Sequence, residues 1–303
     1  MIGTRGSALA RWQAAEIGRL LRAAHPGLEV SEKIVVTQGD RVQTGPVIDL
    51  GGKGVWVKEI EEGLLAREID LAVHSMKDVP AELAPGLAIV AVPTRADPRD
   101  AIVSRDGGGL AALPPGSRIG TSSLRRVCQV RAARTDVSVE ILRGNVDTRL
   151  RKVAEGVVDA AILACAGLDR LGFADRINER LPTTLMLPAI GQGALALEAR
   201  LADARVLSLV RPLSDPAAET TVAAERALLA TLGVGCRTPV AGHAIIEAGR
   251  LIARGLVGRP DASEILLEEV TGRPEQAAEL GAILGARLIA RGADRILADL
   301  EGV

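Results

Sequence analysis

Aromatic residues are almost absent from this chain of 303 residues, which contains two tryptophans, one phenylalanine and no tyrosine. Proteins that bind single-stranded nucleic acid commonly stack bases on aromatic side chains, so this class is disfavoured. The formal net charge of −1 likewise gives no overall attraction to nucleic acid or to an anionic membrane. The hydrophobic cores therefore rest on aliphatic residues, which a hydrophobic content of 48% supplies.

Cysteine and histidine are also scarce, with three of each in the chain. Cys128, Cys165 and Cys236 are too widely spaced for a disulfide framework or a C-x-x-C zinc motif. The histidines show no metal-ligand spacing, so we expect no metal site. No window approaches about 18 uninterrupted apolar residues, and the first residues do not resemble a secretory signal. We therefore expect a reduced, cytoplasmic protein without a membrane span.

Strand-like and helix-like segments alternate along the first two-thirds of the chain. Short apolar runs typical of strands occupy residues 2–4, 32–36, 70–76, 87–92, 101–103, 118–120, 138–142 and 159–164. Helical patterns separate many of these runs, and such alternation predicts βαβ units with mainly parallel sheets. The run at 194–199 is interpreted as a strand that returns to the first sheet.

The pattern changes near residue 214, after which a helix, three strands and a terminal helix predict an α+β domain. Cys236 lies in this last part. The organisation predicts three domains, formed by residues 1–93 with 189–212, by residues 94–188 and by residues 213–303. Residues 37–56 show turn chemistry with little periodicity, and loops of that length in compact domains are usually functional lids or disordered.

A basic cluster is the strongest local signal for a binding site. Residues 118–152 contain nine Lys or Arg and three Asp or Glu, a local net charge of +6. The segment "GTSSLRR" (120–126) lies at a predicted strand-to-helix junction and contains three hydroxyl side chains followed by Arg125 and Arg126. The free N–H groups at the N-terminus of a helix bind anions. Arg143 and Arg149 repeat the arrangement. A solvated basic face is the alternative, but arginines at strand ends favour a ligand with several carboxylates.

The segment "HSMKDVP" (74–80) is a second candidate site at a strand end of the first domain. Ser75, Lys77 and Asp78 are expected to face the same interdomain cleft as the arginines. A carboxylate among cations stays ionised and could stabilise a cationic intermediate or relay a proton. The residues alone leave open a turn-capping aspartate beside a surface lysine, and His74 is interpreted as a core residue.

The cysteines differ in their surroundings. Cys128 lies in a predicted helix and Cys165 ends an apolar strand, so both are predicted to be structural. Cys236 lies in the glycine-flanked loop "LGVGCRTPVAGH" (232–243), where the adjacent arginine can lower a thiol pKa. Its residues alone favour a structural thiol over a nucleophile. The glycine runs "GGKG" (51–54) and "GQGALA" (191–196) match no nucleotide-binding fingerprint.

Together these segments closely resemble the hydroxymethylbilane synthase family, also called porphobilinogen deaminases, over essentially the whole chain. The matching motifs are "GTRGSALARWQA" (3–14), "GGKGVWVKEIEEGLL" (51–65), "DLAVHSMKDVP" (70–80), "IGTSSLRRVCQ" (119–129), "LRGNVDTRL" (142–150), "ACAGLDRLG" (164–172), "LPAIGQGALALE" (187–198) and "GCRTPV" (235–240). The resemblance implies two periplasmic-binding-protein-like (type II) α/β domains and a C-terminal α+β domain. It also implies a transferase of heme biosynthesis that condenses four porphobilinogen molecules head to tail and releases hydroxymethylbilane and ammonia.

The resemblance further implies residue roles. Asp78 matches the catalytic carboxylate, and Cys236 matches the cysteine that carries a dipyrromethane primer through a thioether. The other cofactor-binding positions are Lys77, Ser75, Thr121, Ser123, Arg125, Arg126 and Gly144. The substrate-binding positions are Arg5, Ser7, Lys53, Arg143, Arg149, Arg170 and Gln192. The protein is expected to be a monomer that binds porphobilinogen as its substrate. It is not expected to bind a metal ion, nucleic acid or a membrane.

The chain departs from the family pattern at three places. Its first strand follows a short N-terminus, Asp49 stands where many members carry a basic residue, and Trp56 replaces the commoner phenylalanine. A non-enzymatic anion-binding protein of the periplasmic-binding type is the alternative function, disfavoured by the missing export signal and by the cysteine-bearing third domain. A third alternative is the effector domain of a transcription regulator. It is disfavoured because the sequence shows no helix-turn-helix module for binding DNA.

Overall fold

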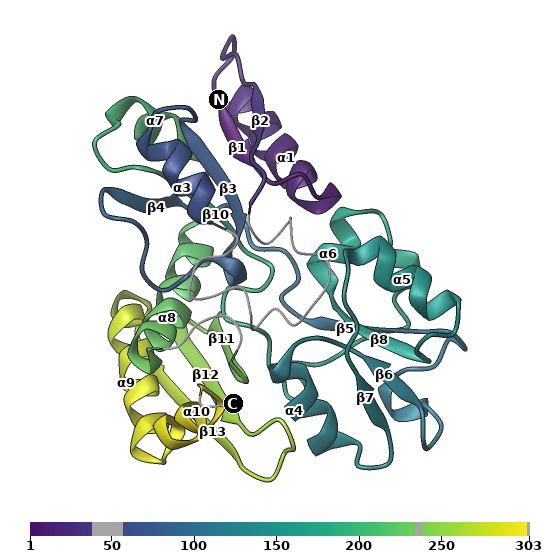
Figure 1. The fold of residues 1–303 in the computed structure, drawn as a ribbon. Coiled ribbons are helices and arrows are strands. Elements are labelled where there is room, and N and C mark those ends of the chain that lie inside the picture. Colours follow the sequence, from purple (N-terminus) through teal and green to yellow (C-terminus); the bar gives the residue numbers. More distant parts are fainter. Residues whose placement is uncertain (38–56, 234–237, 302–303) are drawn as a thin grey trace. The chain divides into compact units, whose positions relative to one another are not determined.

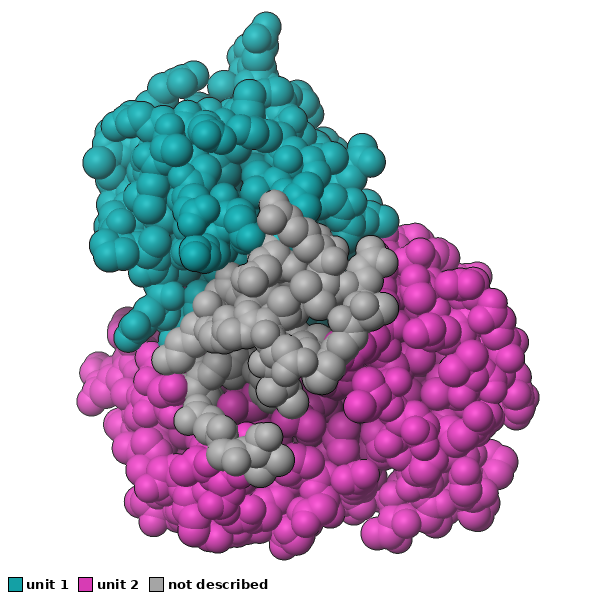
Figure 2. Space-filling model, viewed as in Figure 1, with its two compact units in different colours: residues 1–96, 194–219 teal, residues 97–193, 220–303 magenta. Residues whose placement is uncertain are grey.

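The computed structural model describes residues 1–37, 57–233 and 238–301 (Figure 1). The expected long loop and Cys236 lie outside these residues. The chain divides into two compact units (Figure 2). Unit 1 contains Met1–Ala96 and Ala194–Glu219, and unit 2 contains Asp97–Gly193 and Thr220–Val303.

Unit 1 is built on a five-stranded sheet with the order β2-β1-β3-β10-β4. Its strands are β1 (Ile2–Thr4), β2 (Glu32–Ile34), β3 (Leu71–Ser75), β4 (Leu87–Ala91) and β10 (Leu195–Arg200). Its helices are α1 (Ala8–Ala24), α3 (Lys58–Leu65) and α7 (Ala204–Val210). Strand β1 pairs in parallel with β2 and β3, whereas β10 is antiparallel to β3 and β4. Four strands therefore share one direction, and β10 is reversed.

Alternating side chains of β3 direct its two faces to different helices. Leu71 and Val73 belong to the same buried cluster as Ile17 of α1. Ala72 belongs to the cluster that contains Ile60 of α3. Because successive strand residues point to opposite faces, α1 and α3 cover opposite sides of the sheet. Both faces of β3 are thus apolar, as expected for a strand buried between helices.

Unit 2 contains a second five-stranded sheet with the order β7-β6-β8-β5-β9. Its strands are β5 (Asp100–Ser104), β6 (Arg118–Gly120), β7 (Ser138–Glu140), β8 (Ala160–Ala164) and β9 (Glu179–Arg180), and its helices are α4 (Leu124–Ala133), α5 (Val146–Ala154) and α6 (Cys165–Arg170). Strand β6 is parallel to β7 and β8, and β5 is antiparallel to β8 and β9. The reversed strand in each sheet is the first one after the chain passes from the other unit.

The C-terminal part of unit 2 is an antiparallel sheet with the order β11-β12-β13. Its strands are β11 (Val240–Glu247), β12 (Arg250–Gly258) and β13 (Ile265–Gly272), and its helices are α9 (Ala277–Ala290), α10 (Ala293–Glu301) and all but the first turn of α8 (Pro216–Leu232), which begins in unit 1. Gly281 and Gly285 of α9 face α8 so closely that a Cβ atom would overlap Ala224 or Thr231. These glycines therefore allow the two helices to pack tightly.

The predicted fold class, α/β with mainly parallel sheets and a C-terminal α+β part, is confirmed. One local prediction is wrong, because Cys165 begins α6 instead of ending a strand. The terminal helix predicted over 274–291 agrees with α9 at its end, but α10, which follows Gly292 with its φ of 97°, was not predicted. Helix α7 and strand β9 were also not predicted; β9 has only two residues, both charged. The division into three domains remains a prediction.

Candidate functional site

The carboxyl edge of the unit 1 sheet presents the first group of predicted residues. Strands β1 and β3 are parallel neighbours, so the segments that follow them leave the sheet at one edge. Arg5 and Ser7 follow β1, and a turn of 3₁₀ helix, η2 (Met76–Asp78), follows β3. The structure therefore brings Lys77 and Asp78 to the same edge as Arg5 and Ser7. The hydroxyl of Ser7 caps α1 by accepting a hydrogen bond from the Ala10 N–H at 3.3 Å.

The η2 turn that carries Asp78 is anchored on both sides. Met76 is 2% exposed, and its N–H donates to the carbonyl of Ala194 at 3.0 Å. Val79 is buried directly after the turn. Before it, the side-chain amide of Gln13 donates to Ser75 Oγ at 2.9 Å. Asp78 itself is half-buried, so a carboxylate with access to solvent stands on a fixed backbone.

The carboxyl edge of the unit 2 sheet collects the predicted arginines. Strands β7, β6 and β8 are parallel neighbours, and the segments after them contain Arg143, Thr121 and Arg170, respectively. Strand β5 runs in the opposite direction, and Asp100 at its start pairs with Ala164 at the end of β8. The first residue of β5 therefore lies at this same edge, beside helix termini that can bind anions.

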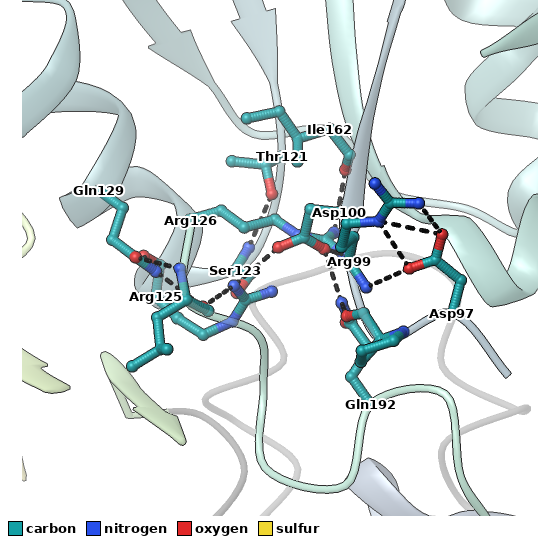
Figure 3. A network of polar contacts seen from close by, with 12 residues as sticks. Asp97, Arg99, Asp100, Thr121, Ser123, Arg125, Arg126, Gln129, Ile162 and Gln192 are labelled. Carbon is teal, nitrogen blue, oxygen red and sulfur yellow. Dashed lines mark hydrogen bonds and ion pairs between the residues drawn. The ribbon is translucent and has the colours of Figure 1, made fainter. Parts of the chain in front are cut away.

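A buried carboxylate joins two of these arginines (Figure 3). Asp100 is 0% exposed, and its Oδ2 accepts a hydrogen bond from Arg125 Nη1 at 2.7 Å. Its Oδ1 accepts from Arg126 Nη2 at 2.7 Å and from Arg126 Nε at 3.1 Å. Gln192 Nε2 donates to the same Oδ1 at 2.9 Å. Burial raises the pKa of Asp100, but the two guanidinium charges outweigh it and hold this pKa well below its usual range.

Two other predicted arginines are partly buried and donate to backbone carbonyls. Arg149 Nε donates to the carbonyl of Gly144 at 2.8 Å, and Arg170 Nη2 donates to the carbonyl of Gly193 at 2.7 Å. Burial lowers the pKa of Arg149 to about 10, and the charge of Arg126 adds to this effect. Burial also lowers the pKa of Arg170 to about 10, against an opposing effect of Asp169. Both side chains remain cationic at neutral pH, so they can attract an anionic ligand.

The turns at this edge are shaped for close backbone approach. Ser123 is the N-cap of α4, and within the described chain its side chain makes no capping hydrogen bond. Its N–H donates to Thr121 Oγ1 at 3.2 Å. Gly144 adopts a φ of 118°, and a Cβ there would lie 2.7 Å from the side chain of Thr148. A larger residue would strain this turn, which supports the prediction that Gly144 belongs to the binding edge.

The two described cysteines behave as buried structural residues. Cys128 and Cys165 are free and buried. Burial raises the pKa of Cys128 to about 11 and that of Cys165 to about 12, so neither thiol ionises at neutral pH. Cys236 and Lys53 lie outside the described residues. Among the residues that are described, no cluster of His, Cys, Asp and Glu could hold a metal ion.

Sequence reasoning missed a second ion-pair network in unit 2. Asp97 accepts hydrogen bonds from Arg99, and Arg180 Nη1 donates to Asp97 Oδ2 at 3.0 Å. Arg180 Nη2 also donates to Asp169 Oδ1 at 2.6 Å. Burial raises the pKa of Asp97, but its bonds to Arg99 and Arg180 lower it overall. Asp100 was missed as well, although a charged residue at the start of the apolar run "DAIV" (100–103) was a usable signal.

These depressed pKa values predict acid sensitivity. Above about pH 4, the ordinary pKa of aspartate, Asp97 and Asp100 stabilise the native state in full. Below that pH the unfolded chain binds protons that the native state does not, so the free energy of unfolding falls. Urea unfolding at a series of pH values between about 6 and about 3 is expected to show this fall. The Asp97→Asn variant, which lacks one such carboxylate, is expected to show a shallower slope; an equal slope contradicts the assignment for Asp97.

The segments of the chain that the structure describes contain no helix long and apolar enough to cross a membrane. The described residues define an α/β protein in which the sheet edge of unit 1 presents Asp78 and the sheet edge of unit 2 presents several arginines. Arginines at strand ends suit an anionic small molecule.

Comparison with known families supplies the particular assignment. The chain belongs to the porphobilinogen deaminase family: the model described as "Porphobilinogen deaminase, dipyromethane cofactor binding domain" matches residues 1–208, and the model for the C-terminal domain matches residues 219–290. A porphobilinogen deaminase of Syntrophobacter fumaroxidans is 50% identical over 299 residues, which cover 99% of this chain and 97% of the relative. One of Sorangium cellulosum is 50% identical over 291 residues, covering 95% and 97%.

Solved structures with similar folds are much more distant. A probable amino-acid ABC transporter extracellular-binding protein of Bacillus subtilis is 11% identical, with a TM-score of 0.41 over 70% of this chain and 88% of that protein. A periplasmic binding protein of Salmonella typhimurium is also 11% identical, with a TM-score of 0.38 over 72% and 92%. Both TM-scores are below 0.5, so the sheet topology itself carries the fold assignment.

Family membership establishes the predicted activity. The protein is a transferase, a hydroxymethylbilane synthase that deaminates and condenses porphobilinogen, and its cofactor is dipyrromethane. The alternative of a non-enzymatic binding protein is therefore set aside.

Proposed function

We propose that Asp78 is the carboxylate that promotes each condensation. Porphobilinogen becomes cationic when it loses ammonia, and a fixed negative charge close to that cation lowers the barrier. The observation that carries this assignment is the anchored η2 turn, which holds Asp78 at the carboxyl edge of unit 1. Lys77 and Arg5 lie at the same edge, and their positive charges suit the carboxylates of the substrate.

The arginines of unit 2 are proposed to hold the acetate and propionate groups of the pyrroles. Each added pyrrole brings two carboxylates, so the bound chain becomes more anionic at every step. Support comes from the burial that lowers the pKa of Arg149 and Arg170 while leaving them charged. Guanidinium groups bind carboxylates in a bidentate geometry that fixes orientation as well as charge. The proposed set in unit 2 is Arg125, Arg126, Arg143, Arg149 and Arg170, with Thr121, Ser123, Gly144 and Gln192 beside them.

The residues at this edge fit the dipyrromethane cofactor. The excess of cationic groups over carboxylates and the Gly144 turn suit a small anionic molecule lying close to the backbone. When bound, the cofactor supplies the pyrrole terminus to which substrate is joined. Its proposed attachment is the thiol of Cys236, which lies in the sequence between α8 and β11. The neutral, buried state of Cys128 and Cys165 supports this choice, because a thiolate is the reactive form.

The organisation of the chain is also part of the proposal. Three domains are proposed, formed by residues 1–93 with 189–212, by residues 94–188 and by residues 213–303; the three separate sheets support this division. A monomeric cytoplasmic enzyme that binds neither nucleic acid nor membranes is supported by the near-neutral net charge and the few aromatic residues.

One pair of measurements tests the proposal on the wild-type protein. Porphobilinogen should be consumed with release of ammonia and hydroxymethylbilane. The intact mass should exceed the mass of the polypeptide by two pyrrole units, and a peptide map should place this gain on the peptide that contains Cys236. An active preparation with an unmodified polypeptide mass would contradict the assignment of Cys236.

The Arg149→Gln variant tests the arginine assignment. The KM for porphobilinogen is expected to rise by about 10- to 100-fold, the loss that follows removal of a charged hydrogen-bond donor. Arg151→Gln is the matched control, because Arg151 lies on the same helix with its side chain 65% exposed and near Glu155. Its KM should stay at the wild-type value. Equal KM values for the two variants would remove Arg149 from the binding set.

A further inference from the structure

Asp100 binds the side chains of both Arg125 and Arg126. It is the first residue of the reversed strand β5, whereas both arginines lie in the first turn of α4. The carboxylate divides its oxygens between them, with Oδ2 accepting from Arg125 and Oδ1 from Arg126. Arg125 and Arg126 are 3% and 6% exposed, so these bonds form away from bulk water. Charge-assisted bonds of this kind are short and directional.

Each arginine has a second fixed partner. Arg125 Nη1 also donates to the carbonyl of Leu187 at 2.7 Å, and Arg126 Nη1 donates to the carbonyl of Ile162 at 2.9 Å. Leu187 is itself held by Gln129, which accepts from its N–H at 2.7 Å and donates to its carbonyl at 3.1 Å. With two anchors, each guanidinium has a defined position and rotation. Such prior ordering reduces the conformational entropy lost on binding a ligand.

The contacts leave donors and charge unused. Both bonds of Arg125 use Nη1, so its Nε and Nη2 have no hydrogen-bond partner in the described part of the chain. Two guanidinium groups against the Asp100 carboxylate leave one excess positive charge in the cluster. The charge of Arg126 helps to lower the pKa of Arg149, so these two cations lie near each other. Arg149 therefore adds to the positive charge of the cluster. Among the described residues, the cluster therefore has spare donors and a positive charge that suit an anion.

We propose that Asp100 is a positioning residue for ligand carboxylates: it holds Arg125 and Arg126 side by side, cancels one of their two charges and directs the remaining donors to the ligand. Without it, two buried cations repel each other and lose their common anchor. This inference rests on the proposed role of the arginines in binding the cofactor and substrate. The described side-chain bonds of Asp100 go to these two arginines and to Gln192, so its effect is transmitted through these side chains.

The test compares Asp100→Asn with Asp97→Asn in the full-length protein. Asp97 also pairs with two arginines, Arg99 and Arg180, but it contacts neither Arg125 nor Arg126 in any bond described for it. Intact mass measures the fraction that carries two pyrrole units, and steady-state assays give KM and kcat for the loaded fraction. Asp100→Asn is expected to reduce loading and to raise KM about tenfold or more, with kcat within about twofold of wild type. Asp97→Asn should match wild type in all three.

Two results would overturn the proposal. One is a folded Asp100→Asn protein with wild-type loading and KM, and the other is an equal loss in Asp97→Asn, which would indicate a general structural effect. A failure of the proposed function and a failure of the role of Asp100 can be told apart. The proposed function is tested on the wild-type protein, whereas the role of Asp100 is tested by the difference between Asp100→Asn and Asp97→Asn.

A second comparison covers the case in which Asp100→Asn does not fold. The double variant Asp100→Asn/Arg126→Gln removes one buried charge of each sign, so the cluster keeps its net charge. If Asp100 positions Arg125, incubation with porphobilinogen should load the double variant about tenfold more slowly than Arg126→Gln alone. Equal loading rates in these two proteins would show that Asp100 does nothing for Arg125.

Discussion

The Asp78→Ala variant is expected to lose about 10²- to 10⁴-fold in kcat, the range found when a catalytic carboxylate or an electrostatic stabiliser is removed. The methyl group of alanine cannot stabilise the cation that porphobilinogen forms on losing ammonia. The fold should be unaffected, because Met76 and Val79, not Asp78, anchor the turn. Porphobilinogen consumption under saturating substrate and a thermal unfolding curve measure the two effects separately.

Two further variants separate the charge of Asp78 from its shape. Asp78→Asn keeps the size of the side chain and removes the negative charge, so it is expected to be nearly as inactive as Asp78→Ala. Glu82→Gln is the matched control, because Glu82 is an exposed carboxylate four residues further along. It should retain wild-type kcat. Substantial activity in Asp78→Asn would show that the charge of Asp78 is not used, and a large loss in Glu82→Gln would point to a diffuse electrostatic effect.

The Cys236→Ser variant is expected to lack the mass of two pyrrole units and to have no measurable synthase activity. A serine hydroxyl is a much weaker nucleophile than a thiolate near neutral pH, so the thioether cannot be replaced by an ether at a useful rate. Intact mass spectrometry of freshly purified protein detects the loss directly. The polypeptide should still fold, because the described hydrogen bonds of the C-terminal sheet connect its own strands.

The other two cysteines provide the controls for Cys236. Cys128→Ala and Cys165→Ala should keep the full mass gain, although each loses some stability from a cavity in a buried site. Their thiols have pKa values raised by burial to about 11 and about 12, so they offer little thiolate for attachment. Retention of the mass gain in Cys236→Ser, or its loss in either alanine variant, would move the attachment to another residue.

Much of the fold could be predicted from the local pattern of apolar residues in the sequence. Apolar runs predicted strands such as β3 and β8, and helical patterns between such runs predicted helices such as α1. The pattern failed where it was short or interrupted. Strand β9 has only two residues, both charged, and the short helix α10 begins directly after Gly292, which adopts a φ of 97°. In both places the backbone is set by partners distant in sequence or by a single φ angle, which periodicity does not report.

The sequence predicted which residues belong to the candidate site but not which of them bind one another. The position of Arg125 after a strand indicated an anion site, because carboxyl ends of parallel strands share an edge. Nothing local indicated that Asp100 would bind it, since the two residues are 25 positions apart. Gln192 reaches the same carboxylate from 92 positions away.

The sequence by itself determined the family, the alternation of strands and helices, and the residue types available for chemistry, because these depend on motifs and local periodicity. The tertiary structure alone decided which charges meet. It reversed β5 so that Asp100 starts at the edge where β8 ends, and it buried Arg125 and Arg126 against that carboxylate. The physical reason is that burial makes an unpaired charge costly, so the charges that a fold encloses are those it can pair.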